Sequence, residues 1–281
     1  MVKRPATWSR QFTFRDREIF YNRIPFNNRA ERAVEVPLAF DFLTRQPSKE
    51  RMLEVGNVLQ YYENALSDAL CIRGRRIIDK FEVGYGIDNV DIIDVDPEEK
   101  YQTIISVSTV EHVGQNSSPT GRFGEQKKSA DLEAPLTAIA KIYDLLAVDG
   151  HALLTVPFGK LMDGGWYVQF SSEYLDLLTT KYNIPQEALS VGYLKRVALE
   201  SRWSNPHQRW IEAAAGELSN VRYDNIASGA RAIAVIELTK LAEPFTFNAA
   251  VLPATPLCYE RSPLARSLFV GVGSVRSWFH R

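Results

Sequence analysis

The chain has 281 residues, of which 45% are hydrophobic and 24% are charged, and its formal net charge is -1. This composition predicts a globular protein with one elaborated domain or at most two small ones, and the near-neutral charge argues against a nucleic-acid partner. Two cysteines, Cys71 and Cys258, are too few for a disulfide framework or a zinc cluster. No apolar run has the length of a signal-peptide core or a membrane span, so we expect a cytoplasmic protein.

The first 48 residues are expected to form a cap made of a hairpin and a helix. Residues 11 to 24 are rich in aromatic and β-branched side chains around a polar centre, which is typical of a hairpin. A helical spacing of apolar residues follows, with Asn27 or Asn28 as its expected N-cap and Pro37 as an expected bend. We expect this segment to lie across the carboxyl edge of the sheet that comes next.

Residues 49 to 241 alternate between buried strands and helices, which predicts an α/β domain with a mostly parallel sheet covered on both faces. The expected strands cover residues 51–56, 75–79, 90–95, 101–109, 151–158, 188–197 and 230–240. The expected helices cover residues 61–72, 132–150 and 207–218. Residues 242–281 contain scattered aromatics and prolines, and we interpret them as a C-terminal extension.

The turn after the first of these strands contains Glu54 and Gly56. A dinucleotide-binding fingerprint beginning at Gly56 would also need glycine at positions 58 and 61, where the chain has Val58 and Tyr61. A pyrophosphate therefore fits poorly, whereas a nucleoside without phosphates needs only one close backbone approach and a carboxylate for its ribose.

Two further carboxylates are expected at the same edge, because Asp79 ends the second strand and Asp94 ends the third. The spacing from Glu54 to Asp79 suits one strand, helix and strand, which would place Asp79 to accept hydrogen bonds from ribose hydroxyls. The four histidines have no metal-ligand spacing, so no metal site is expected.

Five segments in this order resemble the class I S-adenosylmethionine-dependent methyltransferase family over about residues 50 to 160. They are "LEVG", "RRIID", "DIIDVDP", "YQTIISVSTVEHVG" and "LLAVDGHALLTVPFG". The resemblance is closest to methyltransferase-like proteins associated with bacterial cell-surface saccharide genes. It implies a Rossmann-like, three-layered fold with a seven-stranded, mostly parallel sheet whose antiparallel final strand is carried by "ARAIAVIEL".

The resemblance also implies which residues hold S-adenosylmethionine. Glu54 and Gly56 would line its methionine and ribose part, and Asp79 would bind the ribose hydroxyls. The adenine, the third part of the cofactor, would be held by Asp94 together with the backbone of Val95. Ser108 would flank the cofactor after the fourth strand.

This sequence departs from the family at the two glycines that usually follow Gly56, which are Val58 and Gln60 here. A bulkier turn could tighten the site or close it. The sequence therefore leaves open a non-catalytic nucleoside-binding or assembly protein on a decayed methyltransferase fold. A dehydrogenase on the same architecture is disfavoured by the missing glycines.

The expected reaction is methyl transfer to a small-molecule or saccharide acceptor, with oxygen favoured as the acceptor atom. A hydroxyl needs a base, and the expected catalytic residues are His112 and Glu111. His112 is also consistent with a structural role beneath the site. The polar loop 114–131 is equally compatible with a lid and with a plain exposed loop. The rings of Trp166 and Tyr167 are compatible with stacking on the acceptor and with core packing.

The end of the chain gives a weak indication of a further contact. Residues 264–281 place arginines among apolar residues, which hints at a membrane surface or a partner, although glycines argue against a firm amphipathic helix. The sequence does not indicate an oligomeric state.

Overall fold

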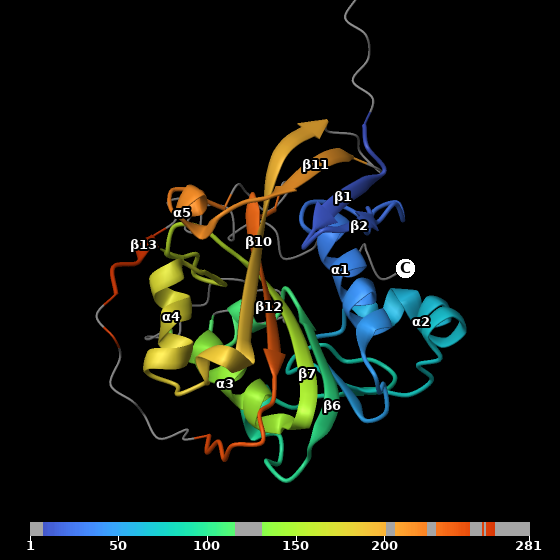
Figure 1. Cartoon of the computed structure of the whole chain (residues 1–281), viewed down its shortest axis with the longest axis vertical. Coiled ribbons are helices and arrows are strands. Elements are labelled where there is room, and N and C mark those ends of the chain that lie inside the picture. Colours follow the sequence, from blue (N-terminus) through green and yellow to red (C-terminus); the bar gives the residue numbers. More distant parts are fainter. Residues whose placement is uncertain are drawn as a thin grey trace, which may run out of the picture.

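The computed structural model describes residues 8–115, 131–200, 206–223, 229–247, 255 and 257–261. Its centre is an eight-stranded sheet with the order β11-β10-β12-β7-β6-β3-β4-β5 (Figure 1). Its strands are β3 (Met52–Val55), β4 (Arg76–Ile78), β5 (Ile87–Asp88), β6 (Tyr101–Val107), β7 (Leu146–Pro157), β10 (Leu189–Glu200), β11 (His207–Glu212) and β12 (Ala232–Thr239). The strands β3 to β7 pair in parallel, and β12 runs antiparallel to both of its neighbours.

This topology confirms the expected Rossmann-like class I methyltransferase fold, with five parallel strands and a reversed strand formed by β12. The sheet has one strand more than the expected seven, because residues 207–212, expected in a helix, form β11 at its edge. Gln208 and Trp210 are buried while their neighbours Arg209 and Ile211 are exposed, which is the two-residue period of a strand. Pairing with the long strand β10 outweighs the helical preference of the alanines that follow, and only α5 (Ala215–Leu218) remains helical.

Helices cover both faces of the sheet, and Figure 1 shows α1 (Arg32–Arg45) and α2 (Glu63–Leu70) on the opposite side from α3 (Ala134–Leu145) and α4 (Ser172–Thr180). Neighbouring strand residues point to opposite faces, so Ile104 packs with α3 whereas Ile105 packs with α1. Each face thereby has its own apolar core. Among the described residues, no helix is long and apolar enough to cross a membrane.

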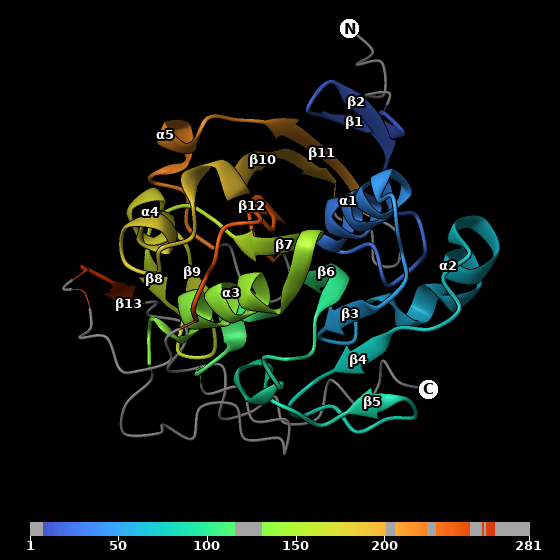
Figure 2. The same cartoon turned by 60° about the horizontal axis from the view of Figure 1, so that its bottom comes forward.

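The expected N-terminal hairpin is confirmed as β1 (Gln11–Phe14) and β2 (Arg17–Phe20), and it lies beside β11 (Figure 2). The ring of Phe14 occupies the space that a side chain at Gly192 of β10 would need. The hydroxyl of Tyr21 accepts a hydrogen bond from the backbone N–H of Trp210 (2.8 Å). The hairpin thus covers part of the open end of the sheet.

The helix α1 lies along one face of the sheet, and only its first turn reaches the carboxyl edge. Its apolar residues share a core with β6, β7 and β12. Before the helix, Asn22 and Asn27 donate to the hydroxyl of Tyr62 just after the Gly56 turn (2.7 and 3.0 Å), so part of the first 48 residues does lie at the carboxyl edge. The helix begins later than expected, with Glu31 as N-cap instead of Asn27 or Asn28. Pro37 lies inside it, and the carbonyl of Ala33, whose usual helical donor would be residue 37, accepts from the N–H of Asn22 instead (2.9 Å).

Part of the C-terminal extension is tied to the domain. The strand β13 (Glu260–Arg261) pairs in parallel with β8 (Met162–Asp163), which itself pairs with β9 (Val168–Gln169). The ring of Phe245 packs edge-on against Tyr143 of α3, and the backbone N–H of Thr255 donates to Glu133. The expected surface contact of residues 264–281 lies outside the described residues.

Candidate functional site

The carboxyl ends of β3 and β4 meet at a turn that contains Gly56. Its backbone has φ +84°, and its N–H donates to the carbonyl of Ile78 (2.8 Å). A Cβ at this position would lie 2.1 Å from the hydroxyl oxygen of Thr109, which follows β6. Glycine is therefore required both by the backbone conformation and by the close approach of the β6 loop.

The side chain of Glu54 holds this turn in place. Its Oε1 accepts hydrogen bonds from the N–H groups of Val58 (2.8 Å) and Leu59 (2.6 Å), and its Oε2 pairs with Arg75 at 2.5 Å. Burial raises the pKa of Glu54, and Arg75 is the strongest opposing influence. Both carboxylate oxygens are thus engaged by the chain, so Glu54 shapes the Gly56 turn and has no free oxygen for a ligand.

The two missing glycines have a structural explanation. Val58 has a right-handed helical backbone (φ -100°, ψ -34°), and Gln60 lies in the 3-10 helix η1 (Leu59–Tyr62) that follows. Neither conformation requires glycine. The turn is held by Glu54, which makes the bonds to the backbone N–H groups of residues 58 and 59.

Asp79 lies directly after β4, as expected. Its Oδ1 accepts from the N–H groups of Phe81 and Glu82 (both 2.8 Å), and its Oδ2 makes no hydrogen bond within the described part of the chain. Glu82, which sequence reasoning missed, accepts from the side chain of Asn57 (2.8 Å) and so links this loop to the Gly56 turn. One oxygen of Asp79 is therefore left to accept a ligand hydroxyl. Two ribose hydroxyls that bond to separate oxygens would need both.

The prediction of a third strand at residues 90–95 is wrong. The third strand is β5, and Asp94 ends the 3-10 helix η2 (Ile92–Asp94), where it is exposed. Asp91 starts this turn, because its Oδ1 accepts from the N–H of Ile93 and its Oδ2 pairs with Lys80 (2.7 Å). The side chain of Val95 is buried in the core.

The end of β6 brings Ser108, Glu111 and His112 together on the 3-10 helix η3 (Val110–His112) and the residues before it. Ser108 has a left-handed backbone (φ +45°), a conformation that residues other than glycine adopt uncommonly. Its hydroxyl donates to Oε1 of Glu111 (2.8 Å), and the same oxygen is 3.7 Å from Nε2 of His112. These three expected site residues therefore form one polar group.

The orientation of His112 follows from its neighbours. Its Nδ1 is 2.7 Å from the backbone carbonyl of Trp166, and its ring stacks on the Trp166 ring with centroids 4.8 Å apart. A carbonyl can only accept, so Nδ1 carries the proton in the neutral ring and Nε2 holds the lone pair. The side chain of His112 is 24% exposed.

Tyr167 is 5% exposed, which agrees with core packing, one of the two alternatives that the sequence left open for this ring. It packs edge-on against Trp166 (4.9 Å between centroids) and obliquely against Tyr223 (4.6 Å). Burial raises the pKa of both tyrosines, so their hydroxyls stay protonated at neutral pH. Tyr223 was not singled out from the sequence, because its approach depends on the return of the chain after β11.

Glu35, in the first turn of α1, acts on the carboxyl of Glu111, and Glu31, just before the helix, acts on Glu35. Burial raises the pKa of Glu111 to about 8, and the bond from Ser108 opposes the rise. Burial also raises the pKa of Glu35 to about 7, opposed mainly by Arg32, whose Nη1 is 3.4 Å from Oε2 of Glu35. Sequence reasoning missed this contribution of α1, since nothing in the local pattern pairs residues 31 and 35 with residue 111.

Replacing Glu111 by glutamine is expected to change how stability depends on pH. Below the ordinary pKa of 4.5 the carboxyl is protonated in both states, and as pH rises towards about 8 only the unfolded chain ionises, so stability is lost over this range. Glutamine abolishes that loss and should stabilise the protein by on the order of 2 kcal/mol above pH ~8. Thermal unfolding across this range measures the effect, with Glu187→Gln on the exposed 3-10 helix η4 (Gln186–Ala188) as the control. If the stability of Glu111→Gln and that of the unsubstituted protein change with pH in the same way, the raised pKa of Glu111 is contradicted.

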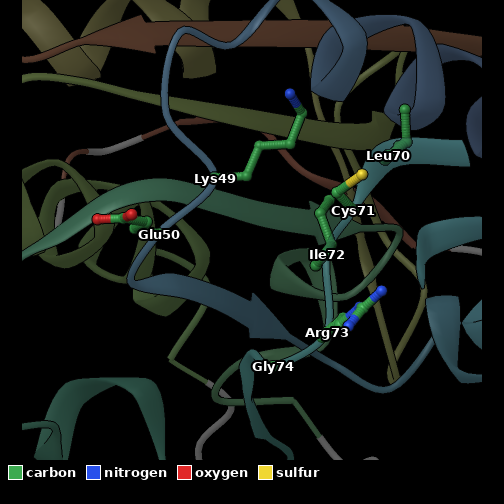
Figure 3. A pocket seen from close by; sticks show the side chains of 7 residues that line it. All are labelled: Lys49, Glu50, Leu70, Cys71, Ile72, Arg73 and Gly74. Atoms are coloured by element: carbon green, nitrogen blue, oxygen red, sulfur yellow. The ribbon is translucent and has the colours of Figure 1, made fainter. Parts of the chain in front are cut away.

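A hollow of about 370 Å³ lies at the opposite, amino edge of the sheet, between the segment before β3 and the loop from α2 to β4 (Figure 3). Its lining consists of Lys49, Glu50, Leu70, Cys71, Ile72, Arg73 and Gly74. It contains none of the expected site residues. In a parallel sheet, ligands bind at the carboxyl ends of the strands, so we place the functional site at the Gly56 edge.

No family model matches this sequence, and it matches no curated protein sequence. Solved structures that it resembles include a SAM dependent methyltransferase from Archaeoglobus fulgidus, with TM-score 0.44 and 12% identity over 74% of this chain and 93% of that one. N-methyltransferase NodS from Bradyrhizobium japonicum WM9, in complex with S-adenosyl-l-homocysteine, has TM-score 0.36 and 13% identity over 72% and 86%. Coclaurine N-methyltransferase, bound to N-methylheliamine and SAH, has TM-score 0.36 and 12% identity over 58% and 50%. Similarity this low transfers no substrate and no residue role to this chain.

Proposed function

We propose that the protein transfers a methyl group from S-adenosylmethionine to a small-molecule or saccharide acceptor, with a hydroxyl oxygen as the favoured acceptor atom. The observation that supports this most directly is the position of the Gly56 turn and the free Oδ2 of Asp79 at the ends of two neighbouring parallel strands. A nucleoside needs one close backbone approach and one carboxylate, and this edge offers both.

The residues at this edge fit the cofactor. The Gly56 turn would border its methionine and ribose part, and Asp79 Oδ2 would accept from a ribose hydroxyl. Asp94 and the Val95 backbone remain the proposed adenine contacts, and Ser108 remains a proposed neighbour of the cofactor. When bound, S-adenosylmethionine supplies a methyl group activated by a positively charged sulfur.

The protein has little chemistry to add beyond alignment and proton removal. His112 Nε2 would take the proton of the acceptor hydroxyl as its oxygen attacks, while the Trp166 carbonyl keeps the ring oriented. Glu111, bound to Ser108 and next to Nε2, would hold this histidine in place. Exclusion of water would favour the transfer, and the aromatic side chains around His112 suit that task.

The helical backbone at Val58 and Gln60 weakens the main argument for a non-catalytic nucleoside-binding or assembly protein. The two functions differ in turnover, since both would bind S-adenosylhomocysteine. Labelled S-adenosylmethionine offered with saccharide, hydroxylated and phenolic acceptors separates them. Binding without methyl transfer to any acceptor would favour the non-catalytic alternative.

Replacing Asp79 by alanine is expected to weaken S-adenosylhomocysteine binding by about 1.5–3 kcal/mol, the range for a lost hydrogen bond to a charged group. Calorimetry measures this directly. Asp79→Asn keeps an oxygen for the N–H groups of residues 81 and 82, so it separates loss of the ligand bond from loss of the loop. Asp68→Ala, on the exposed side of α2, is the matched control. Unchanged affinity in a folded Asp79→Ala protein would move the ribose site elsewhere.

A further inference from the structure

A small sheet with the strand order β13-β8-β9 lies next to the helix η3 that ends at His112 (Figure 2). The strands β8 and β9 are two residues long each and form a hairpin whose turn contains residues 164–167. A hairpin this short is marginally stable without a further strand. The third strand is β13, and Met162 and its partner Glu260 are 98 positions apart in the chain. The hairpin therefore depends on the C-terminal extension.

The turn of this hairpin carries the groups that orient His112. The backbone carbonyl of Trp166 is 2.7 Å from Nδ1 of His112, and the two rings stack with centroids 4.8 Å apart. The turn is closed by the N–H of Gly164, which donates to the carbonyl of Tyr167 (2.9 Å). The position of the carbonyl that fixes the histidine tautomer is thus set by the hairpin.

Glu260 links β13 to this hairpin, and we call residues 255 and 257–261 the strap. The backbone N–H of Glu260 donates to the carbonyl of Leu161 (3.0 Å), one residue before β8. Its Oε2 pairs with Nζ of Lys160 (2.8 Å), and its Oε1 pairs with Nη2 of Arg222 (2.6 Å). One residue of the strap therefore contacts both the start of the hairpin and the segment that carries Tyr223.

The strap is also bound to two helices of the main domain. The backbone N–H of Thr255 donates to Glu133 at the N-terminus of α3, and its hydroxyl accepts from Nζ of Lys181 (3.2 Å) at the C-terminus of α4. The ring of Tyr259 packs edge-on against Tyr174 of α4 (6.3 Å between centroids). Because α3 and α4 pack on the central sheet, the strap can hold the hairpin in a fixed position relative to that sheet.

We propose that the strap is a positioning element for methyl transfer. By completing the β13-β8-β9 sheet, it holds the Trp166 carbonyl where that carbonyl keeps the proton of the neutral His112 ring on Nδ1 and the lone pair on Nε2. The proposal deepens the proposed function, on which it rests for the role of His112 as base. The strap acts through Trp166, and a displacement of about 1 Å in such a positioning group can cost about 10²-fold in rate.

Glu260→Pro in the full chain tests the proposal, because proline removes the N–H that bonds to Leu161. We expect the single-turnover rate of methyl transfer to fall about 10–10²-fold. Affinity for S-adenosylhomocysteine should change little, since none of the strap contacts described above involves the Gly56 turn. Glu260→Ala is the matched control, because it keeps the N–H and removes ion pairs with two exposed cations, so its rate should fall less than about fivefold.

The tautomer of His112 gives a second readout that does not require activity. Two-bond ¹⁵N–¹H spectra of ¹⁵N-labelled protein at pH ~9, where the ring is neutral, report which ring nitrogen carries the proton. Loss of one signal in His112→Asn assigns it. The unsubstituted protein and Glu260→Ala should carry the proton on Nδ1. In Glu260→Pro the proton should shift towards Nε2, because the Trp166 carbonyl no longer holds it on Nδ1.

An unchanged tautomer in a folded Glu260→Pro protein overturns the proposal. If this variant does not fold, Glu260→Lys replaces it, because repulsion from Lys160 and Arg222 displaces the same strand, and an unchanged tautomer then has the same meaning. If S-adenosylhomocysteine does not bind and no acceptor is methylated while the tautomer shifts, the proposed methyl transfer fails and the strap still orients His112. If methyl transfer proceeds and neither its rate nor the tautomer changes, the strap proposal alone fails.

Discussion

Replacing His112 by asparagine is expected to lower the rate of methyl transfer to a hydroxyl acceptor by about 10²–10⁴-fold, the usual contribution of a positioned base. The asparagine amide can still donate to the carbonyl of Trp166, so the local hydrogen bond can be kept. It has no titrating group to accept the acceptor proton. Affinity for S-adenosylhomocysteine should change little, because no expected cofactor contact is removed.

The test compares single-turnover rates and cofactor affinity in the same preparation. His151→Asn is the matched control, since this histidine pairs with Thr103 near the amino end of β6 and its side chain bonds only to Thr239 (3.1 Å) among the bonds described. A large fall in thermal stability with His112→Asn would favour the structural role of this ring. Near-normal turnover would transfer the role of base to Glu111 or to the 114–131 loop, most of which lies outside the described residues.

Replacing Glu54 by alanine is expected to lower the free energy of unfolding by about 3–5 kcal/mol, as for a buried ion pair that loses one partner. The side chain of Arg75 is 4% exposed and would keep, among the described residues, only Glu63 as an ionic partner. The N–H groups of Val58 and Leu59 would also lose their acceptor. The Gly56 turn should loosen, and binding of S-adenosylhomocysteine should weaken with it.

Denaturant unfolding measures the stability change, and calorimetry measures the binding change. The control is Glu63→Ala, which removes the other partner of Arg75 but is half exposed, so it should cost less than about 1 kcal/mol. If Glu54→Ala is as mild as Glu63→Ala, the turn is held by something other than this carboxylate. If stability falls and binding is retained, Glu54 supports the sheet but not the cofactor edge.

Several parts of the fold were predictable from local patterns. The buried strands around Leu53, Ile77, Ile104 and Leu154 form continuous apolar runs, which is how strands covered on both faces differ from half-exposed ones. Gly56 was identifiable because a strand followed by a single glycine indicates a tight turn, and its φ of +84° agrees.

Other parts depended on contacts between distant segments. Residues 207–212 have no strong local preference for a strand, and their conformation is decided by pairing with β10 and by the hydroxyl of Tyr21. Asp94 was misplaced because Asp91 can accept a hydrogen bond from the backbone two residues later, which favours a turn over a strand.

The sequence by itself indicated the class of fold and the edge where Gly56, Asp79, Ser108 and His112 lie, because strand ends follow from apolar runs and short motifs, whereas the strand order was implied by the resemblance to a known family. The surroundings of Glu111 were decided only by tertiary structure. Glu35 is 76 positions away from Glu111 in the chain, and α1 brings it there by packing on the sheet face next to β6. The pKa of each carboxyl depends on that burial, which is a property of the packed core and has no local signature in the sequence.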